Sequence, residues 1–252
     1  MADEVTNESS FTDPLSFLKA FTAARIAIGH TGTSIPLKAS LEFKLAHAHA
    51  RDAVYSAMDV EMLTDRLAQF NLPVLSLHSQ AESRASYLQR PDLGRLLDQS
   101  AKDIVENQVS GPDIAIVIAD GLSALAIHEN SVGLLELLIP KLQAANLRLA
   151  PICLVQQGRV AIGDEIGKGL QAGLSVVFIG ERPGLSAADS MGAYLTYHPR
   201  PGLADDSRNC ISNIRAGGLP ADLAVTKIFY LIQEAFKRKL TGVHLKDNAG
   251  LL

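Results

Sequence analysis

Three short apolar runs, none of them interrupted by a charged residue, constrain the fold more than any other feature of this sequence. They are IAIVIA (114–119), PICLV (151–155) and LSVVFIG (174–180). Because a strand that is apolar on both sides must be covered on both sides, such runs are typical of parallel sheets with helices on each face. The stretches between them, 123–147 and 163–173, read as helices. The sequence therefore predicts an α/β fold, a Rossmann-like, mostly parallel sheet flanked by helices.

The first 110 residues have a different character, because Ala- and Leu-rich stretches predict mainly helices there. The composition changes at Ser110-Gly111-Pro112. We therefore predict a boundary between a mainly helical N-terminal region, 1–110, and an α/β domain, 111–252. The expected helices are at 39–58, near 60–70 and at 93–108, and a short strand is expected at 73–77.

Further elements are predicted near the two ends of the chain. Asp13 followed by Pro14 is typical of an N-cap and a first helical residue, so a helix is expected to begin there. Beyond residue 180 we expect one more strand, at 193–199, and a terminal amphipathic helix at 220–240.

Composition excludes several classes of protein. The chain has 252 residues, of which 47% are apolar, enough for a sizeable core. A net charge of −4 argues against a nucleic-acid-binding protein, which would need a basic face. No apolar run approaches the roughly 20 residues that span a membrane. The acidic start MADEVTNESS does not resemble a secretory signal, and Cys153 and Cys210 form no CxxC pair, so we expect a reducing cytoplasm.

Polar or glycine residues follow each of the three apolar runs. The loops are Asp120–Ser123, Gln156–Val160 and Glu181–Gly184. Because ligands of open parallel sheets bind outside the carboxyl ends of the strands, we expect these loops to meet at one edge and to form a pocket. A second interpretation is that Asp120 and Ser123 only cap the next helix. The Glu181 loop, which Pro183 makes rigid, is the better candidate for contact with a ligand or partner.

The familiar signatures of self-sufficient enzymes are absent. The sequence has no P-loop, no GxGxxG after a strand, no HExxH and no GxSxG. His47 and His49 are two residues apart, so on a helix they face different directions and do not form a metal site. Cys153 lies in a predicted strand and is expected in the core. For Cys210 a buried structural thiol is one of two open interpretations, and no residue nearby resembles a catalytic base for it. The residues alone thus favour a cofactor-binding or regulatory subunit.

Several sequence blocks together resemble one family, the small (light) subunit of ethanolamine ammonia-lyase. The similarity extends from about residue 14 to the C-terminus, and the blocks appear in the order of the family. They are RIAIGHTGTSIPLKASLEFKLAHAHARDAV (25–54), ADGLSALAIHEN (119–130), QQGRVAIGDEIG (156–167), VVFIGERPGLSAADSMGAYLTYHPRPG (176–202) and DSRNCISNIR (206–215).

The resemblance implies the activity and the partner. Ethanolamine ammonia-lyase uses adenosylcobalamin to convert ethanolamine to acetaldehyde and ammonia by a radical mechanism. The substrate-binding barrel belongs to a separate large subunit, and the small subunit covers the cobalamin at the interface of a hetero-oligomer. The cofactor keeps its base on cobalt, which agrees with the absence of a DxHxxG segment here. The chain alone is then expected to be inactive, with no catalytic residue and no metal ligand of its own.

The resemblance also assigns cofactor contacts and a location. The valine of GRVA matches Val160, the glutamate of GERPGL matches Glu181, and the cysteine of RNCIS matches Cys210. Each is expected to contact cobalamin. The N-terminus in this family can direct the enzyme into a bacterial microcompartment, a role that falls here to residues 13–28.

Two other functions agree with the residues alone. One is a non-catalytic regulatory or scaffolding α/β module that binds a partner through the same strand-end loops. The other is a stand-alone nucleotide-dependent enzyme. Activity of the isolated chain, or of a complex with cobalamin, would distinguish them.

Overall fold

The computed structural model describes residues 13–22, 24–108 and 111–248. The chain forms two compact units, Met1–His49 and Ala50–Leu252. The predicted division near residue 110, into a helical region and a cobalamin-contacting domain, stays a prediction. None of the helices in the described ranges combines the length and the apolar character needed to cross a bilayer.

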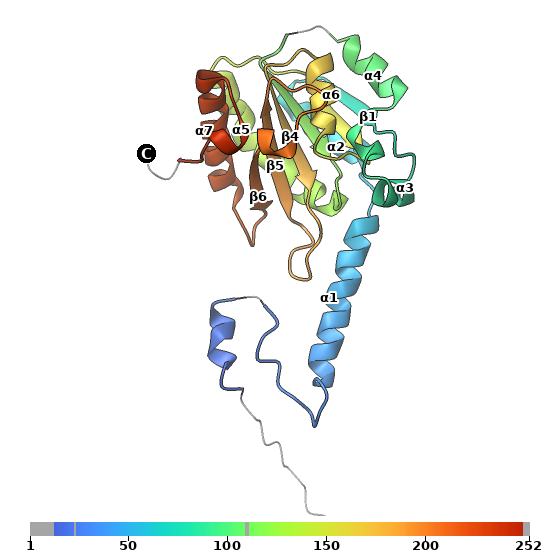
Figure 1. Cartoon of the computed structure of the whole chain (residues 1–252), viewed down its shortest axis with the longest axis vertical. Coiled ribbons are helices and arrows are strands. Elements are labelled where there is room, and N and C mark those ends of the chain that lie inside the picture. Colours follow the sequence, from blue (N-terminus) through green and yellow to red (C-terminus); the bar gives the residue numbers. More distant parts are fainter. Residues whose placement is uncertain (1–12, 23, 109–110, 249–252) are drawn as a thin grey trace, which may run out of the picture. The chain divides into compact units, whose positions relative to one another are not determined.

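The second unit contains one six-stranded sheet with the strand order β1-β3-β2-β4-β5-β6 (Figure 1). The strands are β1 (Val74–His78), β2 (Ile114–Ala119), β3 (Ile152–Gln156), β4 (Leu174–Gly180), β5 (Met191–Tyr197) and β6 (Asn209–Ile214). The first four strands are parallel to one another, whereas β5 pairs antiparallel with β4 and β6 pairs antiparallel with β5. The predicted α/β fold with a mostly parallel sheet is confirmed.

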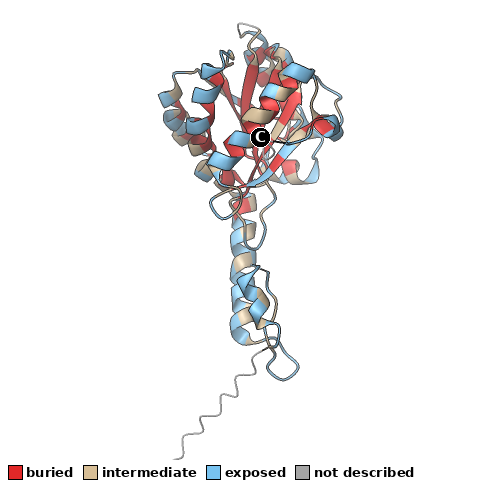
Figure 2. Cartoon of the chain, turned by 90° about the vertical axis from the view of Figure 1, so that its left-hand side faces the viewer, coloured by how far each residue is buried: buried red, intermediate tan, exposed pale blue. Residues whose placement is uncertain are grey.

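Helices cover both faces of the sheet. The helices of the second unit are α2 (Val60–Leu67), α3 (Arg84–Gln89), α4 (Gln99–Glu106), α5 (Ala124–Ala144), α6 (Ile162–Gly169) and α7 (Ala221–Arg238), whereas α1 (Leu37–Tyr55) begins in the first unit. On one face α5 packs against β2, β4 and β5, and α7 packs against β5 and β6. On the other face α6 packs against β2 and β4, and α4 lies against α6 and β1. Figure 2 shows the buried strands between helices whose outer sides are exposed.

The position of β2 between two helical layers explains why every residue of this strand is apolar. Ile114, Ile116 and Ile118 point into the layer below α5 and α7, while Ala115 and Val117 point into the layer below α6. All six residues of the strand are buried. Full burial of one isoleucine side chain is worth about 1.5–3 kcal/mol, so this strand contributes strongly to both halves of the core.

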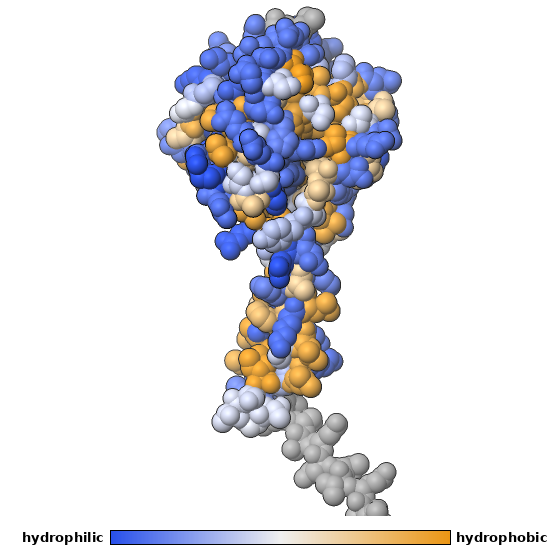
Figure 3. Space-filling view, turned by 90° about the vertical axis from the view of Figure 1, so that its right-hand side faces the viewer, coloured by the Kyte–Doolittle hydropathy of each residue, from blue (hydrophilic) through white to orange (hydrophobic). Residues whose placement is uncertain are grey.

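The first unit differs, because none of its described residues is buried. Several of its large apolar side chains are exposed, and Leu37, Leu41 and Leu45 recur at the four-residue spacing of one helix face. Figure 3 shows apolar side chains gathered along this part of α1.

Two predictions about elements are wrong, and β6 and α3 were not predicted. The predicted helix at 93–108 is a short 3₁₀ helix, Leu93–Arg95, followed by α4, because the backbone N–H of Leu97 donates to Glu165 and Asp98 caps the new helix. The predicted helix after Asp13 is only the 3₁₀ helix Ser16–Ala20. The remaining 3₁₀ helices are Ala68–Phe70, Asp205–Ser207 and Gly242–His244.

Candidate functional site

The loops that follow β2, β3 and β4 meet at one edge of the sheet, as the sequence predicted. The buried carboxylate of Asp120 accepts the backbone N–H groups of Gln157 at 2.9 Å and Gly158 at 3.1 Å. The N–H of Leu122 donates to the carbonyl of Gly180 at 2.9 Å. Asp120 is therefore not a helix cap. It links the end of β2 to the turn after β3.

Ser123 does cap a helix, and it has a second role. Its hydroxyl oxygen accepts the N–H of Ala126 at 3.3 Å in the first turn of α5. The same hydroxyl donates to the carbonyl of Ala188 at 2.7 Å. Ala188 lies in the loop between β4 and β5, so Ser123 also fastens the segment that follows Glu181.

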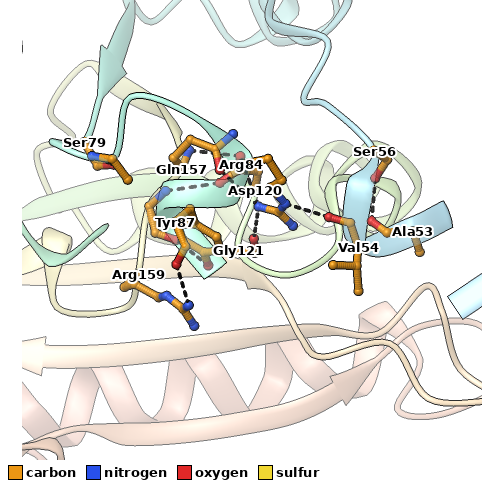
Figure 4. Close-up of polar contacts among 12 residues, drawn as sticks. Ala53, Val54, Ser56, Ser79, Arg84, Tyr87, Asp120, Gly121, Gln157 and Arg159 are labelled. Carbon is orange, nitrogen blue, oxygen red and sulfur yellow. Dashed lines mark hydrogen bonds and ion pairs between the residues drawn. The ribbon is translucent and has the colours of Figure 1, made fainter. Parts of the chain in front are cut away.

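A partly buried arginine supports this edge from α3 (Figure 4). Arg84 donates through Nε to the carbonyl of Val54 at 2.6 Å and through Nη1 to the carbonyl of Gly121 at 2.8 Å. Its Nη1 also lies 4.0 Å from Oδ2 of Asp120. Arg84 therefore brings positive charge to an otherwise buried carboxylate.

Tyr87 lies between two guanidinium groups. The Cζ atoms of Arg84 and Arg159 lie 4.7 Å and 4.1 Å from the centre of its ring, the arrangement of a cation–π contact. Its hydroxyl donates to the carbonyl of Gly158 at 3.2 Å, and burial raises the pKa of this phenol. Sequence analysis missed Arg84 and Tyr87, because no local pattern in RASYLQ indicates a contact with loops more than 30 residues away.

Glu181, a predicted site residue, follows β4 directly and joins three strands. Its carboxylate accepts the hydroxyls of Ser190 and Ser212, each at 2.5 Å, and the backbone N–H of Asn213 at 3.1 Å. A Cβ atom at Gly192 would lie 3.0 Å from Oε1 of Glu181, so the glycine leaves room for the carboxylate.

Cys210, the second predicted site residue, lies on β6 and is exposed. Its interpretation as a buried structural thiol is therefore wrong, whereas Cys153 is buried in β3 as predicted. Tyr194 lies directly opposite Cys210 across the β5–β6 pair and is hydrogen bonded to it. Partial burial, and secondarily the charge of Glu181, raise the pKa of the Cys210 thiol, although the bond to Tyr194 opposes them. The thiol is thus protonated at neutral pH and is a poor nucleophile.

Val160, the third predicted site residue, ends the turn that Asp120 holds. It is partly buried and packs, like Tyr194, against the apolar layer that includes α6. Its carbonyl accepts the N–H of Gly163 at 3.2 Å in the first turn of α6.

Exposed residues of β6 lie beside Glu181, which accepts hydrogen bonds from Ser212 and Asn213. On β6, Ile211 and Ile214 are buried while Cys210 and Ser212 are exposed, so this strand presents a solvent-facing side. Helix α6 packs on the neighbouring β4. In the part of the chain that the structure describes, no group of three His, Cys, Asp or Glu side chains could hold a metal ion. His47 and His49 are exposed on α1.

The fold and this edge define a class of protein: an α/β protein with loops from three strands joined at one edge of its sheet and, among the described residues, no evident catalytic set. Comparison with known proteins is more specific. The sequence model described as "Ethanolamine ammonia-lyase light chain (EutC)" matches residues 12–246. Proteins called ethanolamine ammonia-lyase small subunit are 52% identical in Xanthomonas campestris pv. campestris, over 94% of this chain and 89% of the relative, and 50% identical in Pseudomonas fluorescens (strain SBW25), over 94% and 87%.

The chain belongs to the small (light) subunit family of ethanolamine ammonia-lyase, a carbon–nitrogen lyase. The Pseudomonas syringae relative is 48% identical over 99% of this chain and 88% of its own length. The family is that of a cobalamin-dependent enzyme, and the name small subunit implies a large one. Membership of this family does not support the two alternatives, a scaffolding module and a stand-alone nucleotide-dependent enzyme.

The buried carboxylate of Asp120 should make the stability of the folded protein depend on pH in a way that can be tested. Burial raises its pKa, although the Gln157 and Gly158 N–H groups and Arg84 oppose this effect. The folded state therefore binds the Asp120 proton more tightly than the unfolded state does. As the pH rises above about 4, this difference lowers the free energy of unfolding. In urea unfolding, wild type should lose more stability than Asp120→Asn as the pH is raised through this range.

A control of opposite sign is Asp92→Asn. The hydrogen bond from Arg90 lowers the pKa of Asp92, so wild type should gain stability relative to this variant as the pH rises towards about 4, and the difference should stay constant above it. Parallel curves for wild type and Asp120→Asn would contradict the interpretation of Asp120.

Proposed function

We propose that this chain binds the large subunit of ethanolamine ammonia-lyase and covers adenosylcobalamin at the interface between the two subunits. The cofactor would be in its base-on form. The observation that carries the proposal is the clustering of sequence-distant residues. Glu181 accepts hydrogen bonds from Ser212 and Asn213 of β6, the strand that carries Cys210. Val160 ends the loop after β3, beside α6, and both Val160 and Tyr194, the partner of Cys210 on β5, pack against the same apolar layer. These three contacts would form one wall, which we call the cofactor wall.

The residues of the cofactor wall fit the chemistry of a corrin edge, which bears amide side chains and methyl groups. A carboxylate has about four acceptor positions, and donors within the protein occupy three of the four positions of Glu181. One position on Oε1 is left for a cofactor amide N–H. Val160 and the protonated thiol of Cys210 would give apolar contact.

The division of labour follows from these groups. Adenosylcobalamin supplies the radical chemistry, and the protein supplies binding, orientation and exclusion of water. On this chain Glu181 would orient the corrin edge, and Val160 and Cys210 would exclude water from it. Substrate contacts and catalytic groups would belong to the large subunit.

The first test is reconstitution. The isolated chain should not convert ethanolamine, because the described residues form no evident catalytic set. Mixed with the large subunit and adenosylcobalamin, it should give acetaldehyde and ammonia and a cobalamin difference spectrum. The large subunit without this chain is the control, and turnover by the isolated small subunit would contradict the proposal.

The second test concerns Glu181. In the assembled enzyme, Glu181→Gln should weaken adenosylcobalamin binding about tenfold or more, because a hydrogen bond to a charged acceptor contributes about 1.5–3 kcal/mol. A difference-spectrum titration measures this, with the unfolding midpoint recorded in parallel. Glu234→Gln, which removes ion pairs to Lys237 and Arg238 on α7, is the matched control and should bind normally. Unchanged affinity in Glu181→Gln would rule out its role.

We further propose that residues 13–28 direct the enzyme into a bacterial microcompartment. In support, Leu15, Phe17 and Phe21, in or beside the 3₁₀ helix Ser16–Ala20, are 54%, 63% and 82% exposed. Such apolar side chains suit docking to another protein. A fluorescent protein fused to this segment should concentrate in microcompartments, and a fusion carrying Phe17→Ser and Phe21→Ser should not. Diffuse fluorescence of the unaltered fusion would exclude this role.

A further inference from the structure

The chain contains an almost completely buried ion pair, Asp164 with Arg208. Nη1 and Nη2 of Arg208 donate to the two carboxylate oxygens at 2.6 Å and 2.7 Å, and the two side chains are 3% and 2% exposed. Nη1 also donates to the hydroxyl of Thr196 at 3.1 Å, and Nη2 to the carbonyl of Leu203 at 3.3 Å. The planar guanidinium thus has a fixed, two-point connection to the carboxylate.

The stability of the fold does not by itself explain this pair. Removing two charges from water costs several kcal/mol per ion, and apolar residues of similar volume often replace a buried ion pair without loss of stability. A well-attested role of such pairs is to select one geometry among several. The position of the pair therefore matters more than its contribution to stability.

Asp164 and Arg208 lie beside two of the proposed cofactor contacts. Asp164 is in the first turn of α6, four residues after Val160. Arg208 is two residues before Cys210, directly before β6 begins. The ion pair therefore ties the helix that follows Val160 to the strand that carries Cys210.

Helix α6 cannot move independently of the sheet. A Cβ atom at Gly163 would lie 2.3 Å from Cγ2 of Val177, and one at Gly167 would lie 2.3 Å from Cγ of Pro199. These close approaches seat the helix directly on β4 and on the residues after β5. The position of Asp164 is therefore fixed relative to the sheet.

Strand β6 is held weakly by its place in the sheet. Like β1, it is an edge strand with one neighbour, and its pairing with β5 shifts register between Met191 and Ala193, whereas the pairing of β1 with β3 is regular. Arg208 holds the strand before Cys210, and Glu181 holds it after Cys210 through Ser212 and Asn213. The two fastenings lie on either side of the exposed thiol.

We propose that Asp164 and Arg208 are positioning residues that set the separation between Val160 and Cys210 in the cofactor wall. The proposal rests on the proposed function, because it takes those residues as cobalamin contacts. Because both side chains are almost completely buried, neither residue of the pair would touch the cofactor. Their loss should weaken cofactor binding without changing the chemistry after the cofactor is bound.

The test replaces both charges together in the assembled enzyme. Asp164→Leu combined with Arg208→Met leaves no unpaired buried charge, so folding and copurification with the large subunit should persist. A cobalamin difference-spectrum titration of the assembled enzyme should show about tenfold weaker binding, and the apparent KM for adenosylcobalamin should rise by a similar factor. Because a positioning defect acts on binding, kcat at saturating cofactor should stay within about twofold. Asp113→Asn combined with Arg148→Gln removes an Asp–Arg pair before the amino ends of β2 and β3, far from the carboxyl-end loops. This control should leave cofactor binding and kcat unchanged.

A folded double variant with the wild-type KM for adenosylcobalamin would overturn the positioning role. If the double variant does not fold, Arg208→Lys decides, because lysine keeps the charge but not the two-point geometry. This variant should also raise the KM for the cofactor, and a wild-type value would overturn the role.

Glu181→Gln separates this inference from the proposed function. If Glu181→Gln weakens cobalamin binding and the variants of the pair do not, only the positioning role is wrong. If neither weakens it, the proposed cofactor wall is wrong as well.

Discussion

Burial of β2 on both faces and between two parallel neighbours is the constraint on which the rest of the structure depends. Its side chains enter the layers under α5 and under α6, so both layers are built on one strand. Because β3 and β4 run parallel to it, all three strands deliver their next residues to the same edge. The loops there are packed at backbone distance: Gly121 has a φ of +58°, and a Cβ atom on it would lie 2.3 Å from the carbonyl oxygen of Gly180. A substituent at this position would force the edge apart.

The edge built in this way is rigid before any ligand arrives. Asp120 fixes the turn before Val160, Ser123 fixes the segment after Glu181, and Arg84 neutralises part of the buried charge. Hydrogen bonds within the protein satisfy most of the carboxylate of Glu181. A preformed wall of this kind reduces the entropy lost on binding a large cofactor. It suits a subunit that supplies shape and shielding while its partner supplies the reacting groups.

Sequence alone predicted the parts of the fold that depend on continuous burial. The strands at 114–119 and 174–180 have the bounds of β2 and β4, because an unbroken apolar run has few other solutions. The convergence of the three loops followed from parallel pairing. The contacts of Arg84 and Tyr87 could not be predicted, since they depend on where α3 packs. Val160, Glu181 and Cys210 were found by resemblance to a family, and their role as cobalamin contacts stays a prediction.

Strand β6 escaped prediction for a reason that bears on the behaviour of the protein in solution. Only Ile211 and Ile214 are buried, and the other residues are Asn, Cys, Ser and Asn, which do not form a strand pattern. The same composition has an advantage at the border of a sheet, where unpaired N–H and C=O groups could recruit a strand from another molecule. A polar and irregular border is a poor template for such pairing. The residues that hide this strand in the sequence therefore also oppose aggregation of the small subunit before it meets its partner.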